Sequence, residues 1–465
     1  MEYILYKKNI PILKYEETNG YIEVKQVYNK EHLPVHLYIN GKASDSNLYA
    51  LNEKLEEFLD NRLIPSTRKN FSETLNELEI KSNLELAKKS WFLSLSDQYW
   101  VCPIEQKDKL FWEDINFFKN DYDSAIGLRL VRGSKSLNKN TSSYSPDNTT
   151  NGELPKRWVK IDGINYLEKA GSGTEQQEPL NEVLASEICR RLGIPFVPYQ
   201  LKIEDEKYYS LCPDMVDEDS ELVSMDAVYQ DLHLIDNTFY DFNQLLSRCQ
   251  SLGIPDAENT LLKIILVDFI IANVDRHAYN ISFIRNSNNL QWKGLAPVYD
   301  SGKSMFLNLL DFEMKMKPSS QIESKPFYPN QAEQIKNLPM HKISTQINLS
   351  NLADLDKWYS DFLQPLKRLS KEKKQALVEK LRERIEEAKK YLSPQAQLQK
   401  SSQKTDSINL IFSILKANPT ATKEEVAAAT GLSRATVTRS YQKLAELGKI
   451  KRIGSNKTGH WKITE

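Results

Sequence analysis

Hydrophobic and polar positions along the chain predict a mixture of helices and short strands. Residues 22–28 alternate in part like a half-buried strand, and residues 261–272 form a strongly apolar run of helical length. Residues 371–392 are highly charged but place apolar side chains on one face, as an amphipathic helix does. Leucines on one face predict a further helix over residues 48–63: Leu48, Leu51, Leu55, Leu59 and Leu63.

The middle of the chain combines strand pairs with single helices. Residues 157–169 predict a β-hairpin, because the Asp162-Gly163 pair suits a tight primed turn. A helix is expected over residues 178–192, since a glycine follows it as a stop signal. A second pair of short strands is expected within residues 281–298, on either side of an Asn-rich turn.

These patterns and shifts in composition divide the chain into four regions. Residues 1–130 form an N-terminal α/β region that is part of, or packed on, the next domain. Residues 131–395 form the largest domain, residues 396–405 a linker rich in Gln, Ser and Lys, and residues 406–465 a separate small domain.

Composition restricts the class of protein. The chain has 465 residues, of which 40% are hydrophobic, enough for a large core. Its 62 Lys and Arg nearly balance its 63 Asp and Glu, so the whole protein is not a bulk nucleic-acid binder, although one domain can still be basic. The four cysteines are widely spaced without a C-x-x-C pair, which favours free thiols in a reducing compartment. We find no signal-peptide pattern or apolar run of spanning length, and therefore expect a cytoplasmic protein without a membrane partner.

Residues 273–280 carry the most informative chemistry. Asp275 and Asn280 stand in a D-x-x-x-x-N relation, and Asp300 follows the second strand pair. Phosphoryl transfer from ATP needs one carboxylate to orient the acceptor hydroxyl and take its proton. It also needs an amide and a second carboxylate to hold magnesium ions. The spacing therefore predicts Asp275, Asn280 and Asp300 as catalytic residues, with Asn280 and Asp300 as ligands of Mg²⁺.

Two lysines of the predicted hairpin compete for the phosphates of ATP. Lys160 lies within an apolar strand, in the manner of the V-A-I-K lysine of protein kinases. Lys169 lies at the far end of the second strand and is expected to be solvated, so we favour Lys160. Glu182, in the predicted helix, is the candidate partner of Lys160, as the helix glutamate is in protein kinases.

Position alone indicates the rest of a nucleotide site. Residues 208–213 predict a strand leading to a hinge, where backbone groups near Cys212 could meet adenine. Gly152, ahead of the hairpin, is the candidate for a loop over the phosphates. Neither a G-x-G-x-x-G nor a Walker A motif accompanies it.

Together these residues resemble the HipA-like kinases, the toxin kinases of bacterial toxin–antitoxin systems. The catalytic loop, the Ala-Pro-Val-Tyr-Asp strand end at Asp300 and the helix with Asn181-Glu182 are similar to motifs of that family. The resemblance covers residues 145–395. It implies a two-lobed, protein-kinase-like α+β fold, ATP and Mg²⁺ as cofactors, a Ser or Thr hydroxyl of a protein as acceptor, and an antitoxin partner.

The resemblance also implies self-modification. HipA-like kinases typically carry a Ser-x-x-Gly-x-x-x-Lys-like stretch over the phosphates, and its Ser can be autophosphorylated. Residues 149–156 are similar, with Thr149 in place of the Ser. Thr149, or Ser145 just before it, is therefore the expected autophosphorylation site.

Residues 406–465 have the pattern of a winged helix-turn-helix. A first helix over residues 407–417 is followed by a capping box that starts at Thr422 and by a third helix capped by Ser433. The segment has ten Lys and Arg against five Asp and Glu, enough for contacts with DNA phosphates. The expected DNA contacts lie on the third helix and the wing: Ser433, Arg434, Thr436, Thr438, Arg439, Lys451, Arg452 and Lys457.

Two other function classes fit parts of this pattern. The loop from Asp275 to Asn280 is also similar to that of phosphoinositide kinases, so a lipid or small-molecule kinase is one alternative. A non-catalytic transcription regulator, whose kinase-like body only binds ligand, is the other. We expect a HipA-like Ser/Thr kinase, toxin-type or regulatory, whose winged helix serves autoregulation.

Overall fold

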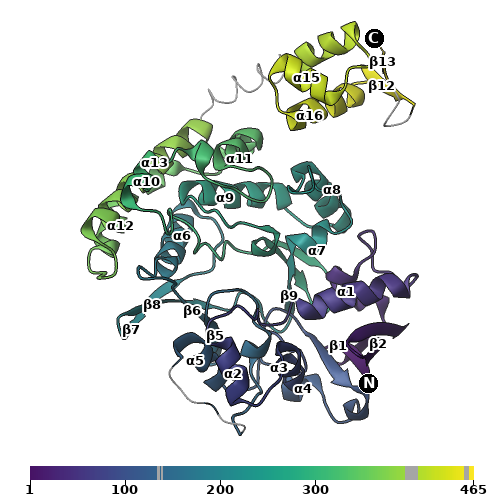
Figure 1. Cartoon of the computed structure of the whole chain (residues 1–465), viewed down its shortest axis with the longest axis vertical. Helices are drawn as coiled ribbons and strands as arrows, with labels where there is room; N and C mark the ends of the chain where they lie inside the picture. Colours follow the sequence, from purple (N-terminus) through teal and green to yellow (C-terminus); the bar gives the residue numbers. More distant parts are fainter. Residues whose placement is uncertain (134–136, 138–139, 393–406, 455–459, 465) are drawn as a thin grey trace. The chain divides into compact units, whose positions relative to one another are not determined.

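A computed structural model describes residues 1–133, 137, 140–392, 407–454 and 460–464. The chain divides into two compact units, Met1–Ala388 and Lys389–Glu465 (Figure 1). The N-terminal region and the large domain thus share one unit, and the predicted linker at residues 396–405 lies outside the described residues.

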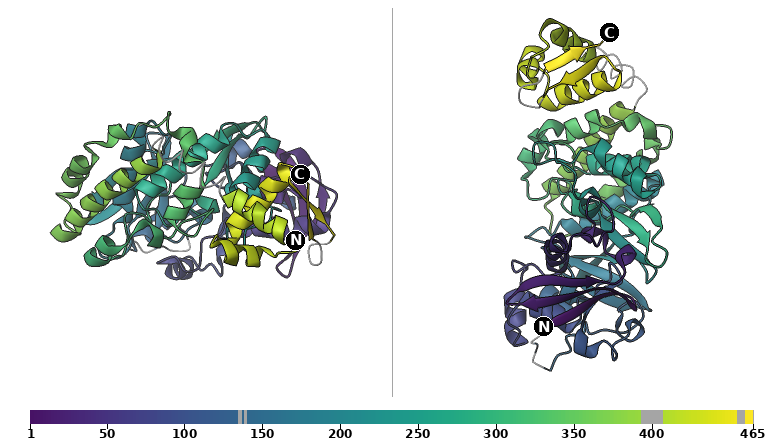
Figure 2. Two further views of the ribbon diagram at one scale, coloured as in Figure 1. Left: turned by 90° about the horizontal axis from the view of Figure 1, so that it is seen from above. Right: turned by 90° about the vertical axis from the view of Figure 1, so that its right-hand side faces the viewer.

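The N-terminal region is built on a four-stranded antiparallel sheet in the order β3-β2-β1-β4. The strands are β1 (Glu2–Lys7), β2 (Ile10–Thr18), β3 (Tyr21–Val27) and β4 (Tyr99–Pro103). The predicted helix over residues 48–63 is confirmed as α1 (Leu48–Asp60), which lies across one face of this sheet (Figures 1 and 2). Its Leu51, Leu55 and Leu59 are buried in the shared core.

Short helices follow β3. α2 (Phe71–Glu77) and α3 (Asn83–Lys89) precede β4, and α4 (Trp112–Ile115) and α5 (Ala125–Arg132) lie between β4 and the next sheet. Ile126 and Leu130 of α5 are buried against Phe71 of α2 and Leu86 of α3. The chain thereby reaches the second sheet without leaving the compact unit.

The second sheet has the antiparallel order β5-β6-β8-β7. Its strands are β5 (Lys156–Ile161), β6 (Ile164–Ala170), β7 (Gln200–Glu204) and β8 (Lys207–Pro213). The predicted hairpin is confirmed, with its turn at Asp162-Gly163, where both residues have positive φ. The predicted helix over residues 178–192 is α6 (Glu178–Leu192), and the left-handed Gly193 ends it.

A third sheet, in the order β11-β10-β9, belongs to the part of the large domain that also holds most of the remaining helices (Figure 1). The strands are β9 (Ser220–Ser224), β10 (Ser282–Asn286) and β11 (Trp292–Leu295). The helices are α7 (Met225–Tyr229), α8 (Phe242–Leu252), α9 (Ala257–Ile270), α10 (Asp311–Met316), α11 (Gln331–Asn337), α12 (Leu355–Leu363) and α13 (Lys371–Leu392). The apolar run over residues 261–272 is confirmed as the buried helix α9 and the residues just after it.

None of the helices within the described parts of the chain is both long and apolar enough to cross a membrane. All four cysteines are buried and free, as their spacing predicts.

The second unit has its own core. The predicted first helix spans residues 407–417, and α15 (Lys423–Thr430) and α16 (Arg434–Glu446) follow it. The capping box of α15 at Thr422 and the cap of α16 at Ser433 are both confirmed. Strands β12 (Ile450–Ile453) and β13 (His460–Ile463) pair antiparallel. Buried side chains from these elements form one cluster: Ile411, Leu415, Val426, Val437, Tyr441, Leu444 and Ile450.

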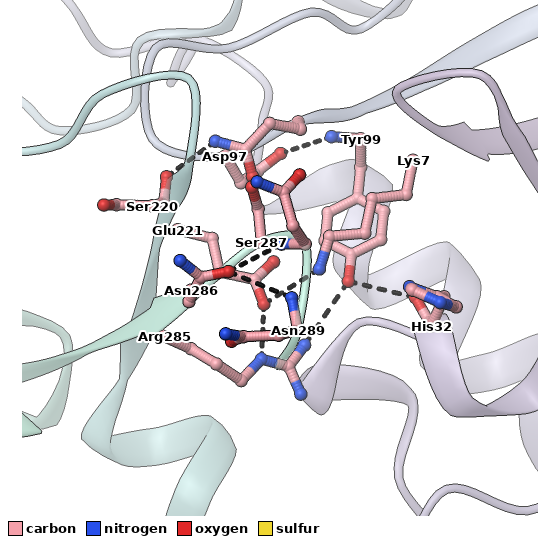
Figure 3. A network of polar contacts seen from close by, with 12 residues as sticks. Lys7, His32, Asp97, Tyr99, Ser220, Glu221, Arg285, Asn286, Ser287 and Asn289 are labelled. Carbon is pink, nitrogen blue, oxygen red and sulfur yellow. Dashed lines mark hydrogen bonds and ion pairs between the residues drawn. The ribbon is translucent and has the colours of Figure 1, made fainter. Parts of the chain in front are cut away.

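A buried carboxylate joins the first sheet to the third (Figure 3). Glu221 of β9 lies 3.1 Å from Lys7 Nζ of β1 and also accepts from Arg285 Nε of β10. Arg285 donates onward to Tyr38 OH at 2.9 Å and to Tyr99 OH at 3.4 Å. Burial disfavours the charge of Glu221, but Arg285 and Lys7 outweigh it and lower the pKa of this carboxyl. The N-terminal region is therefore fixed to the large domain by a buried carboxylate that two basic side chains share.

Replacing Glu221 by Gln should lower the free energy of unfolding by about 3–5 kcal/mol, because Lys7 and Arg285 would remain buried without a counter-charge. Asp219→Asn is the matched control. Asp219 also pairs with a lysine, Lys8 directly after β1, at 2.9 Å, but the Asp219 side chain is 52% exposed. It should cost less than about 1 kcal/mol. Denaturant titration followed by circular dichroism measures both variants, and equal losses would contradict the prediction.

Candidate active site

Three charged side chains from separate elements meet beside the second sheet. Lys169 Nζ, at the end of β6, lies 2.9 Å from Asp300 Oδ1 and 3.2 Å from Glu182 Oε1 of α6. The other carboxylate oxygen of Glu182 accepts a 2.9 Å hydrogen bond from Ser301 N. Tyr199 OH lies 3.3 Å from Lys169 Nζ and accepts from Asp300 N. The fold thus brings Glu182 and Asp300 to one lysine.

Charge pairing sets the ionisation of these groups. Burial opposes ionisation of Asp300, but Lys169 and Lys156 hold the pKa of its carboxyl well below the ordinary value. Burial likewise opposes the charge of Lys169, yet Asp300 and Glu182 raise the pKa of its amine. For Glu182, burial dominates and raises the pKa. Lys169 is therefore a fixed cation and Asp300 a fixed anion near neutral pH.

The lysine at this centre is not the one that the sequence favours. Lys160 Nζ donates a 2.6 Å hydrogen bond to Asn120 O and lies 5.3 Å from the centre of the Tyr122 ring. The expected pairing of Lys160 with Glu182 is therefore wrong. The expectation that Lys169 is solvated is also wrong, because its side chain is 7% exposed.

Lys160 misses the site because of its position along β5, although its side chain lies on the same face of the strand as that of Lys156. Lys156 is directly opposite Lys169 in the hairpin, and Lys160 lies four residues farther along β5 on the same face. A strand rises about 3.3 Å per residue, so this displacement is about 13 Å. Lys156 is thus a second lysine at the site, and burial together with Lys169 lowers its pKa to about 7.

The segment ahead of β5 is held in place by an arginine of the N-terminal region. Arg68, which is 2% exposed, donates from Nε to Gly152 O at 2.9 Å and from Nη2 to Gly152 O and Thr150 O. Gly152 has φ +101°, a backbone conformation that other residues rarely adopt, and Lys156 Nζ lies where a Cβ atom would be. The candidate phosphate loop therefore lies directly beside Lys156.

The two expected autophosphorylation sites directly precede this segment in the chain. Thr149 Oγ1 donates to Leu93 O, and Ser145 Oγ donates to Asp147 Oδ2 at 3.1 Å. Thr149 is 6% exposed, and Ser145 is fully buried. Both hydroxyls are thus turned into the protein in this arrangement.

A single buried guanidinium fixes the candidate catalytic loop. Arg276 forms a two-bonded ion pair with Asp268 of α9, with N–O distances of 2.9 and 3.0 Å. It also donates to Asn280 O at 2.9 Å, to Tyr299 O, and to Ser301 Oγ at 3.0 Å. Tyr299 and Ser301 flank the predicted metal-binding aspartate. One side chain therefore holds the segments of both predicted magnesium ligands.

The oxygen atoms of Asn280 and Asp300 suit magnesium. Asn280 donates from Nδ2 to Asp275 O at 2.9 Å, which leaves its Oδ1 available to a metal ion. Asp300 supplies a carboxylate whose side chain is 35% exposed. Within the described ranges, no group of three His, Cys, Asp or Glu side chains is placed to hold a metal by itself. Mg²⁺ commonly takes one or two protein oxygens and completes its shell with phosphates and water, so this donor pair fits it.

Asp275 has positive charge on both sides. Lys303 Nζ lies 3.2 Å from its Oδ2, and Lys325 Nζ lies 3.4 Å from its Oδ1. His277 Nε2 lies 3.9 Å from Oδ2, while His277 Nδ1 accepts a hydrogen bond from Tyr279 N. Burial lowers the pKa of His277, so the ring is neutral at pH 7 and carries its proton on Nε2.

Cys212 lies in β8 opposite Leu167 and is buried with Val197 and Tyr199. Burial raises the pKa of its thiol to about 12, so it is an uncharged packing residue. That neighbouring backbone groups meet adenine stays a prediction.

The predicted DNA contacts lie in the second unit. Ser433 uses its side chain to cap α16. Arg434 pairs with Glu424 at 2.8 Å, and the side chains of Arg434 and Glu424 are both more than half exposed. Lys457 lies outside the described residues. The other predicted contacts lie on α16 or β12: Thr436, Thr438, Arg439, Lys451 and Arg452.

Sequence reasoning missed several basic residues around the site. Lys156 could have been found, because it ends the Ser-x-x-Gly-x-x-x-Lys-like stretch. The remaining three stand in segments without a recognisable pattern and reach the site only through the fold: Arg68, Lys303 and Lys325.

Comparison with known proteins places this geometry in a family. The family model of the HipA-like C-terminal domain matches residues 149–388, and a winged helix-turn-helix DNA-binding model matches residues 406–451. No curated protein sequence matches the chain significantly.

Two solved structures are similar to the chain. A chain from the Shewanella oneidensis MR-1 toxin–antitoxin complex of HipA, HipB and operator DNA is 12% identical, with a TM-score of 0.50. The match covers 84% of this chain and 97% of that one, and confirms the predicted α+β, HipA-like fold class. The Helicobacter pylori proinflammatory kinase CtkA is 17% identical over 50% of this chain and 92% of its own, with a TM-score of 0.40.

The family match spans just over half of the sequence and contains every residue of the Lys169, Arg276 and Asp275 arrangement. The chain therefore belongs to the HipA-like kinase family and carries in addition a winged helix-turn-helix domain.

Proposed function

We propose that this chain is an ATP- and Mg²⁺-dependent kinase that transfers the γ-phosphoryl group to a Ser or Thr hydroxyl of a protein. One observation carries the proposal: Lys169, Glu182 and Asp300 meet, and Arg276 joins them to the loop of Asp275. This arrangement satisfies the separate needs of phosphoryl transfer for a phosphate-binding cation, metal ligands and a base.

Each side chain has a defined task in this proposal. Lys169 binds phosphate oxygens, and Glu182 orients its ammonium group. Asp275 accepts a hydrogen bond from the acceptor hydroxyl and takes its proton. Asn280 and Asp300 would hold Mg²⁺, which neutralises charge on the phosphates.

We also propose autophosphorylation at Thr149 or Ser145. Each hydroxyl is bonded inside the protein, so modification requires this segment to leave its position. Such a movement would carry Gly152 away from Lys156 and open the phosphate site. Self-modification would thus act as a regulatory step in a toxin-type or regulatory kinase.

The winged helix is proposed to bind DNA and to serve autoregulation. Support comes from the family match, from the local excess of basic residues and from a free-standing core that presents α16 and the β12–β13 hairpin. In the similar Shewanella complex, HipA occurs with HipB and operator DNA. By analogy, an antitoxin partner is proposed for this chain as well.

Asp275→Ala should lower phosphoryl transfer about 10²- to 10⁴-fold, because the acceptor hydroxyl loses its base. Mass spectrometry after treatment with ATP and Mg²⁺ reports both self-modification and transfer to proteins of a cell extract. Asp361→Ala, an exposed carboxylate on α12, is the control and should change nothing. If Asp275→Ala retains full transfer while folding and DNA binding are intact, the kinase proposal fails.

Lys169→Met should lower kcat/KM for ATP about 10²- to 10³-fold, the typical cost of removing a charge-stabilising group. Lys160→Met is the matched control, since it removes a lysine from the same face of the same hairpin. Steady-state kinetics at varied ATP, with thermal melts to verify folding, measure both variants. A larger effect for Lys160 would restore the assignment favoured by sequence.

The 406–465 fragment should shift DNA from its own promoter region, with affinity falling steeply as salt rises. Lys451→Ala should reduce the salt slope by about 1, because one phosphate contact is lost. Lys443→Ala is the control, since Lys443 pairs with Glu446 at 3.0 Å in the last turns of α16. Absence of a shift at low salt would remove the autoregulation proposal.

A further inference from the structure

The carboxylate proposed to receive the acceptor hydroxyl is approached by two lysines from solvent. Lys303 and Lys325 come from separate segments and contact opposite oxygens of Asp275, at 3.2 and 3.4 Å. Their side chains are 44% and 48% exposed, whereas Asp275 is 21% exposed. An acceptor hydroxyl that binds Asp275 therefore lies close to two partly exposed ammonium groups.

The two ammonium groups border the place that an acceptor hydroxyl would take. A hydroxyl must come within about 2.6–3.2 Å of the carboxylate to transfer its proton. Lys303 and Lys325 lie at nearly that distance, one on each oxygen. Each carboxylate oxygen can accept a second hydrogen bond, so an acceptor hydroxyl bound to Asp275 lies beside both ammonium groups. Anionic side chains next to that hydroxyl can pair with these two cations.

Lys325 is the more available of the two cations. Lys303 is shared with Glu153 Oε2, which lies 3.6 Å away on the phosphate-loop side. Lys325 pairs with Asp275 and, within the described part of the chain, with no second carboxylate.

We propose that Lys303 and Lys325 form an acceptor-side subsite that selects Ser or Thr hydroxyls within acidic peptide segments. The inference rests on the proposed kinase function, because it assigns Asp275 to the acceptor. Carboxylates flanking the hydroxyl pair with these two ammonium groups, whereas basic flanks place like charges beside each other. The lysines act as specificity-determining residues and do not take part in proton transfer.

The chain offers a closely matched control. Lys342 is 45% exposed and pairs with Glu258 at 2.6 Å, so it resembles both lysines in exposure and in having a carboxylate partner. It has no contact with Asp275 in the described structure. Lys342→Met therefore tests for general effects of removing a half-exposed lysine.

The experiment uses the full chain with ATP, Mg²⁺ and two degenerate peptide pools. Both pools have a central Ser or Thr, flanked by Asp and Glu in one pool and by Lys and Arg in the other. The wild-type protein should prefer the acidic pool. Each exposed charge contact is expected to contribute about two- to fivefold to kcat/KM. Lys325→Met should reduce the preference by that factor, Lys325→Glu should reverse it, and Lys342→Met should leave it unchanged.

The outcomes separate this inference from the kinase proposal. If the wild-type protein phosphorylates itself or the peptides but shows no preference for the acidic pool, the inference is wrong and the kinase proposal stands. If Lys303→Met and Lys325→Met raise the KM for ATP and leave the preference intact, the lysines serve the nucleotide and the inference is again wrong. If the wild-type protein transfers no phosphate from ATP to itself or to either pool, the kinase proposal fails and the inference falls with it.

Discussion

The geometry of the candidate site depends on the guanidinium group of Arg276. Its side chain is 1% exposed, and it distributes its N–H groups over Asp268, two backbone carbonyls and Ser301. Burial opposes its charge, but Asp268 more than compensates and raises the pKa of the arginine. A lysine could not replace it, because only the planar fork of arginine reaches several acceptors at once in fixed directions. The loop of Asp275 and the segment of Asp300 are therefore placed relative to each other by the core below them, before any nucleotide binds.

Much of this arrangement could be predicted because it is encoded locally. The spacing between Asp275 and Asn280 lies within one loop, and the apolar helix α9 that delivers the loop has an unmistakable pattern. The β5–β6 hairpin and the capping box of α15 depend on neighbouring residues alone. The error at Lys160 arose where local information ends. Alternation along a strand gives the face of a side chain, but which end of the hairpin meets Asp300 depends on contacts between distant segments.

Those distant contacts can be named. Val197 N donates to Val298 O at 2.9 Å, so the segment after α6 holds the strand end that leads to Asp300. Asn181 Nδ2 donates to Gly302 O at 2.7 Å and to Ser304 O at 2.8 Å, one turn of backbone beyond the aspartate. Helix α6 thus positions its own Glu182 and the carboxylate across from it as a single body. The sequence Asn-Glu near a helix start indicates the helix. Only the fold reveals that Asn181 helps to set the distance between Glu182 and Asp300.

The N-terminal region contributes to both halves of this unit. Glu221 fixes it to the third sheet through Lys7 and Arg285, while Arg68 fixes the phosphate loop through Gly152 and Thr150. Hydrogen bonds from a charged donor contribute about 1.5–3 kcal/mol each, so any movement of the loop away from Lys156 must first break bonds made by a residue outside the matched family domain. The energy that holds the loop over the site therefore comes partly from residues 1–130. Residues 1–130, which share one compact unit with the large domain, therefore affect both the stability of the fold and the position of the loop.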